Sequence, residues 1–122
     1  MKDYGDIHAE NINIATQLPE NKRIYILNGL PGVGIPVGST ILHFIYPENF
    51  PIIDERTIKS LQYFEYLDRD KSVGQLRDNP ESYNKYRNTI LKIQNDCKEE
   101  WNLRQIDKAL FAFEKYELNK LQ

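Results

Sequence analysis

Residues 30–54 have the sequence LPGVGIPVGSTILHFIYPENFPIID, and this stretch determines how the first half of the chain is predicted to fold. Its first five residues contain two glycines and a proline, which is typical of a turn. A mostly apolar helix is predicted to begin at Pro36, because the first helical turn accommodates proline, and it must end by Pro47. We expect this helix to be buried. Residues 51–53 should be extended, and Asp54 should begin the next helix as its N-cap.

Helical spacing of apolar residues continues on both sides of this stretch. Further helices are predicted over residues 7–18, 20–28, 80–101 and 103–116. Asn102 and Gln105 have the spacing of a capping box at the start of the last helix. A polar linker is expected over residues 68–80. The patterns together predict an all-α protein of about six helices, in a single domain that spans residues 1–122.

The composition is that of an ordinary globular protein. The chain has 122 residues, of which 40% are hydrophobic and 28% charged. The formal net charge of −2 argues against a broad basic surface of the kind that most nucleic-acid-binding proteins have. Any contact with DNA should therefore come from a local patch or from backbone amides.

The single cysteine, Cys97, excludes a disulfide within the chain and suits a reducing cytoplasm. One cysteine and two histidines cannot build a zinc site of the usual kind, so we predict no metal and no cofactor. The sequence has no long apolar run. We therefore predict neither a signal peptide nor a membrane helix.

The glycine hairpin, residues 30–34, allows several interpretations. Glycines permit positive φ and let successive amides point at one anion, such as a DNA phosphate. A P-loop is unsupported because Ile35 and Pro36 replace its lysine and hydroxyl residue. The dinucleotide-binding glycine pattern does not fit either, because the gap between the second and third glycines is one residue too long in this sequence. A plain turn between helices, with no ligand, remains an alternative.

The hairpin, the helix after it and Asp54 together resemble the helix-hairpin-helix element of the endonuclease III superfamily of base-excision DNA glycosylases. The resemblance covers residues 21–59, about a third of the chain, and implies a helix-hairpin-helix element at about residues 21–46. It identifies Asp54 as the catalytic aspartate. The implied DNA-binding residues are Gly32, Val33, Gly34 and Lys59.

This resemblance implies a mechanism for Asp54. Its carboxylate would stabilise the positive charge that develops on the deoxyribose and orient an attacking water, after the target base has left the duplex. Pro36 stands where lyase members carry a nucleophilic lysine. Any activity would therefore be monofunctional, with water as the nucleophile. The four-cysteine iron–sulfur loop of many relatives is absent.

The chain also departs from the family. Glycosylases hold the flipped base between two helical lobes, and residues 1–29 are too few for the usual lobe before the hairpin. A homodimer could complete the cleft. Between residues 21 and 59 the charge is only slightly positive, so DNA affinity should be weak and salt-dependent. The alternatives are a non-catalytic module that binds DNA backbone or a protein partner, and a homo-oligomeric structural protein.

Other polar side chains receive structural interpretations. Arg56 is predicted to form an ion pair with a neighbouring helix, and His43 to be a hydrogen-bonded core residue. Asp107 is predicted to pair with a basic residue and to have no chemical role. Core packing is predicted for three aromatic residues that follow Asp54: Tyr63, Phe64 and Tyr66.

Overall fold

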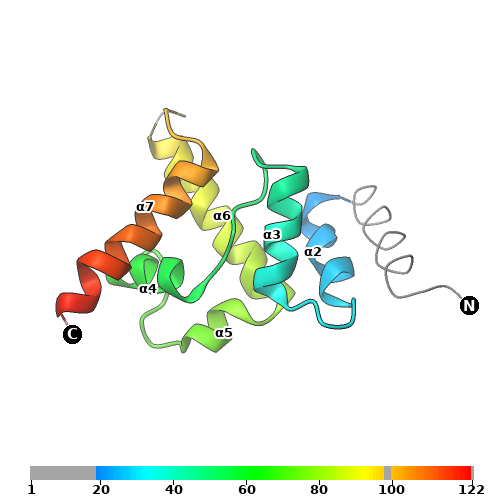
Figure 1. Ribbon diagram of the computed structural model, residues 1–122, viewed down its shortest axis with the longest axis horizontal. Coiled ribbons are helices and arrows are strands. Elements are labelled where there is room, and N and C mark those ends of the chain that lie inside the picture. The colour runs from blue at the N-terminus through cyan, green and yellow to red at the C-terminus, as the bar shows by residue number, and fades with distance from the viewer. Residues whose placement is uncertain (1–18, 98–99, 122) are drawn as a thin grey trace, which may run out of the picture.

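The computed structural model describes residues 19–97 and 100–121, and helix labels follow Figure 1. This part of the chain contains six α-helices and one short 3-10 helix, and it contains no strand. The elements are α2 (Glu20–Asn28), α3 (Ile35–Ile45), α4 (Glu55–Tyr63), α5 (Val73–Arg77), α6 (Pro80–Asp96), α7 (Leu103–Tyr116) and η1 (Leu118–Leu121). The all-α prediction is confirmed. The helix predicted over residues 7–18 lies outside the described residues.

Helix α5 corrects the prediction of a continuous linker over residues 68–80. Ser72 and Gln75 form a capping box, in which the Gln75 amide donates to the Ser72 hydroxyl at 3.2 Å and the Ser72 amide donates to the Gln75 side chain at 2.9 Å. Leu76 is buried and joins the core. The sequence pattern did not predict this helix because it is only five residues long and attaches to the core through Leu76 and the partly buried Val73.

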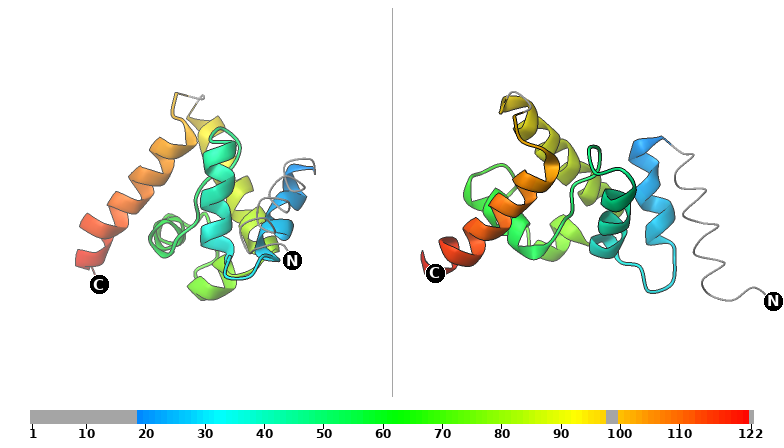
Figure 2. Two further views of the ribbon diagram at one scale, coloured as in Figure 1. Left: turned by 45° about the vertical axis from the view of Figure 1, so that its right-hand side comes forward. Right: turned by 45° about the horizontal axis from the view of Figure 1, so that its top comes forward.

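Helix α6 lies in the middle of the molecule and packs against α2, α5 and α7 (Figure 1). Helices α2 and α3 pack together on one side of it, and α4 packs on α7 on the other side. The two rotated views in Figure 2 keep α2 and α7 on opposite sides of the molecule. The fold therefore has two groups of helices joined by α6 and by the extended segment that connects α3 to α4.

The apolar stripe of α6 forms the centre of the core only over its first half. Tyr83, Tyr86 and Ile90 are fully buried. The predicted continuation to Trp101 is wrong, because α6 ends at Asp96 and the Trp101 side chain is 45% exposed. The neighbouring helices do not extend far enough to cover the second half of this stripe.

Helix α3 is buried on one face only, which corrects the prediction of a buried helix. Leu42 is fully buried, and Gly38 lets α2 approach closely, since a Cβ at this position would lie 3.3 Å from the Ile24 side chain. On the other face, Val37 is 50% exposed and Phe44 is 80% exposed. These apolar side chains face solvent beside the pockets described below.

The extended segment, residues 50–53, is held by side chains in place of a partner strand. His43 Nδ1 donates to the Phe50 carbonyl at 2.8 Å, which confirms the predicted core role of this histidine. The Ile53 amide donates to the Ser39 hydroxyl at 3.1 Å. From α6, the hydroxyls of Tyr83 and Tyr86 donate to the carbonyls of Pro51 and Ile52, each at 2.8 Å. This network fixes the backbone immediately before Asp54.

Candidate active site between α3 and α7

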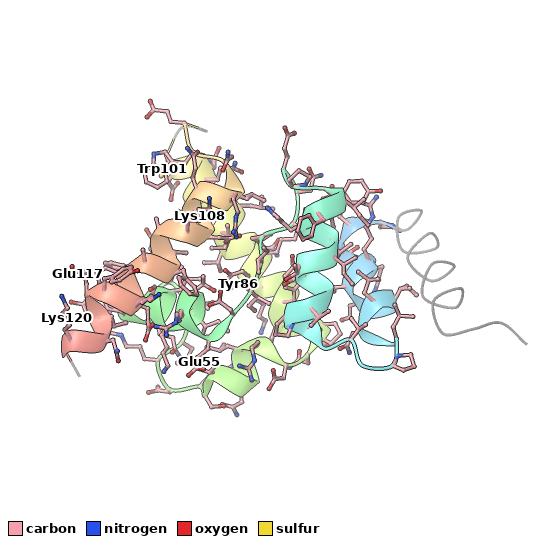
Figure 3. The ribbon with its side chains drawn as sticks, in the orientation of Figure 1. Glu55, Tyr86, Trp101, Lys108, Glu117 and Lys120 are labelled. Atoms are coloured by element: carbon pink, nitrogen blue, oxygen red, sulfur yellow. The ribbon has the colours of Figure 1, made fainter. Side chains whose placement is uncertain are left out.

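Two adjoining pockets lie along α7 and share Ile52 and Arg104 in their linings, and only the larger one reaches α3. The smaller pocket has a volume of about 230 Å³ and is lined by Ile52, Asp54, Arg104, Asp107, Lys108 and Phe111. The larger has a volume of about 430 Å³ and is lined by Thr40, His43, Phe44, Pro47, Ile52 and Arg104. Figure 3 shows Lys108 on α7, and Tyr86 in the space between α7 and α3. We call the two pockets together the cleft.

Asp54 caps α4 and borders the smaller pocket. Its Oδ1 accepts a hydrogen bond from the Thr57 amide at 2.9 Å, and its own amide donates to the Thr57 hydroxyl at 3.2 Å. The N-cap prediction is therefore confirmed. The positive end of the α4 dipole lies beside the carboxylate and favours its negative charge. Capping engages one carboxylate oxygen, and the side chain also lines the smaller pocket.

Asp107 is the most unusual polar residue of the cleft, with only 3% of its surface exposed. Its Oδ2 accepts a hydrogen bond from the Ile52 amide at 2.9 Å. Burial, reinforced by the charge of Asp54, raises the pKa of Asp107 to about 7, although the Ile52 hydrogen bond and the charge of Arg104 act in the opposite direction. The predicted pairing with a basic residue is wrong, because Asp107 forms no ion pair with the described residues and is bound by a backbone amide of the extended segment.

The sequence contains a pattern that indicates a buried position for Asp107. The buried residues of α7 include Leu103 and Ile106, and position 107 lies one turn after Leu103 on the same inner face. A carboxylate at such a position must be paired or have a raised pKa. Reading Asp107 as a member of the apolar face would have marked it as a candidate functional residue.

Two cations and an aromatic ring complete the smaller pocket. Arg104 and Lys108 lie one helical turn apart on α7 and both line it. Phe111 contributes an aromatic wall, and the Arg56 guanidinium lies 5.3 Å from the centre of this ring. Arg56 also pairs with Glu114 of α7 at 2.5 Å, which confirms the predicted ion pair. The pocket thus combines two carboxylates, two cations and an apolar face.

The hairpin has a well-defined turn. The Val33 amide donates to the Leu30 carbonyl at 3.1 Å, and Gly32 has a φ of 76°, as in a type II turn with Pro31 and Gly32 at its centre. The Val33 amide is therefore engaged within the turn. Over residues 19–97 and 100–121, no protein acceptor receives a hydrogen bond from the amides of Gly34 and Ile35. These two amides can bind an anion at the start of α3.

Lys59 is not brought into the cleft. Its Nζ lies 2.9 Å from Glu55 Oε1 on the same helix, and it lines a different pocket. The prediction that the aromatic residues after Lys59 pack in the core is wrong. Each of them is between about two-fifths and one-half exposed: Tyr63, Phe64 and Tyr66.

Comparisons with models of protein families, with curated proteins and with solved structures return no significant match. None of the helices placed by the structure is long and apolar enough to cross a membrane. Among the side chains of residues 19–97 and 100–120, no three His, Cys, Asp or Glu residues gather as a metal site would require.

Proposed function

We propose that this protein binds DNA in the manner of helix-hairpin-helix DNA glycosylases and presents Asp54 to a nucleotide flipped into the cleft. The observation that carries the proposal is the position of Asp54. The residue selected by the sequence resemblance lines a pocket together with Asp107 and the two cations of α7. In this proposal the protein is a monofunctional enzyme, in which Asp54 orients water to hydrolyse an N-glycosidic bond.

The hairpin supplies the second part of the proposal. Helix α2, the turn at residues 30–34 and helix α3 lie in the range for which the resemblance implies a helix-hairpin-helix element, and this succession of two helices and a turn supports the proposal. The amides of Gly34 and Ile35 can hold one phosphate oxygen without a lysine. A contact of this kind positions the protein on the backbone and reads no sequence.

The local charge of the cleft explains how a protein with a net charge of −2 could bind DNA. Arg104 and Lys108 form a small basic patch on the α7 wall. With so few phosphate contacts, the affinity should be weak, and it should fall only modestly with salt, because the slope of the salt dependence scales with the number of phosphates contacted.

A second candidate function is a non-catalytic module that binds the DNA backbone. The capping box of Asp54 favours it, because this box by itself accounts for an aspartate at the start of α4. The two functions differ in whether the cleft recognises a missing or extruded base.

The first test is fluorescence anisotropy at low and moderate salt, with a plain duplex and with a duplex that carries an abasic-site analogue. We expect tighter binding to the analogue, because extrusion of a nucleotide requires less energy where base pairing is already lost. Equal, salt-dependent binding to both duplexes would support the non-catalytic module. Failure to bind either duplex would contradict both functions.

The hairpin is tested by placing a charge at its last residue. Gly34 is the N-cap of α3 with φ −82° and ψ 177°, and a Cβ would come no closer than 3.8 Å to the Pro36 side chain. Asp and Asn are both favoured N-caps, so Gly34→Asp and Gly34→Asn should fold equally well. We expect Gly34→Asp to bind duplex DNA about tenfold more weakly than Gly34→Asn, because only the aspartate repels a phosphate.

The matched pair is compared by anisotropy at the same salt concentration, and circular dichroism checks the fold of both variants. Identical affinities of the two variants would show that no phosphate approaches the amides of Gly34 and Ile35.

A further inference from the structure

The second carboxylate oxygen of Asp107 has no partner. Asp107 Oδ1 is buried and accepts no hydrogen bond from the rest of residues 19–97 and 100–121, because the nearby Tyr86 hydroxyl donates to the Ile52 carbonyl, whereas Oδ2 accepts from the Ile52 amide. Buried polar atoms in folded proteins are nearly always satisfied, and exceptions occur at sites with a function. The oxygen belongs to a side chain that lines the smaller pocket. A ligand in this pocket could supply the missing donor.

The surroundings restrict the chemistry of that donor. Neither of the two cations of the pocket, Arg104 and Lys108, forms an ion pair with Asp107, so the carboxylate is not engaged by a charged partner. Phe111 offers an apolar surface for a flat ring. A ring that packs on Phe111 and donates an N–H from its edge would match both features. Amino-bearing nucleobases have this chemistry, and aspartate is a common acceptor for the cytosine amino group.

We propose that the smaller pocket selects a nucleobase with an exocyclic amino group on its Watson–Crick edge, whose N–H donates to Asp107 Oδ1. This inference rests on the proposed function, because the base must first be extruded from the duplex. Entry of the base requires Arg104 and Lys108, which have long flexible side chains, to turn outward toward the DNA phosphates. A base with a carbonyl at the same position is rejected, because its oxygen would face the carboxylate oxygen.

The charged and titratable groups around Asp107 come from every neighbouring element. They are Arg104 and Lys108 on α7, Asp54 at the start of α4, and Tyr83 and Tyr86 on α6. Asp107 Oδ1 accepts the amino group when the carboxyl is ionised. The raised pKa of Asp107 therefore agrees with a site that is completed only when a donor arrives.

The experiment compares duplexes with one unpaired nucleotide that carries adenine, hypoxanthine, cytosine or uracil. Adenine differs from hypoxanthine, and cytosine from uracil, mainly by an amino group in place of a carbonyl. Binding is measured by competition anisotropy at pH 8, with Asp54→Asn as the common background so that no base is released. We expect each amino base to bind about tenfold more tightly than its carbonyl counterpart.

Asp107→Asn is the decisive variant. Its side-chain oxygen can keep the bond to the Ile52 amide, so its NH₂ group then replaces Oδ1 and donates where the carboxylate accepted. We expect the preference to reverse toward hypoxanthine and uracil. A purely structural role of Asp107 would change all four affinities equally.

The outcomes separate the inference from the proposed function. Equal affinity for amino and carbonyl bases, or an unchanged preference in Asp107→Asn, would overturn the inference alone. If no duplex with an unpaired nucleotide binds more tightly than the fully paired duplex, the proposed function fails, and this inference fails with it. Thermal unfolding of each variant checks that the fold is kept.

Discussion

Asp54→Asn is expected to lower the rate of base release by at least about 100-fold, while DNA affinity and stability stay close to those of the wild type. The carboxylate stabilises the positive charge of the transition state, and a neutral amide cannot. Asparagine is an N-cap as good as aspartate, and its oxygen can still accept from the Thr57 amide, which Asp54 Oδ1 engages at 2.9 Å. The measurement is single-turnover release of the base from a duplex with an unpaired nucleotide.

Asp54→Ala is the matched control for the structural role of this residue. It removes both the charge and the cap, so it should lower the free energy of unfolding by about 1 kcal/mol in addition to the loss of activity. If Asp54→Ala lost stability while Asp54→Asn kept wild-type stability, DNA binding and base release, Asp54 would be only a capping residue. Unchanged base release in Asp54→Asn would show that another group performs the chemistry.

The second large effect is a loss of stability as the pH rises through the range in which Asp107 titrates. Burial raises the pKa of Asp107 from 3.8 to about 7 in the folded protein. Between these values the folded state binds more protons than the unfolded state, so the free energy of unfolding falls as the pH rises. The loss in free energy of unfolding is absent below about pH 4. It is complete above about pH 7, where it is on the order of 4 kcal/mol.

Asp107→Asn isolates this effect, because an amide does not titrate and retains an acceptor for the Ile52 amide. Urea unfolding at pH 5 and at pH 8 should show the variant gaining stability relative to the wild type as the pH rises. Glu20 has a lowered pKa from its hydrogen bond with Asn49 and from Arg87, and its contribution has the opposite sign in both proteins. A difference between variant and wild type that does not change with pH would contradict the raised pKa of Asp107.

Local interactions determined the elements that the sequence predicted well. The bounds of α2 agree with the prediction, and α6 begins at Pro80, as predicted, with Asn79 as its N-cap. The Asn102 capping box at the start of α7 is also confirmed. Each of these signals depends on residues within one helical turn, so it can be recognised without knowledge of the neighbouring helices.

Tertiary packing decided the features on which the proposals rest. Helix α3 exposes Phe44 because no other described element covers that face, although its sequence is apolar on most sides. Asp107 is buried because the extended segment lies against α7, and a segment more than fifty residues away in the chain supplies its hydrogen bond. The sequence by itself selected Asp54 as a candidate. Only the folded chain placed Asp54 beside a second carboxylate, because that proximity depends on how α4 and α7 pack.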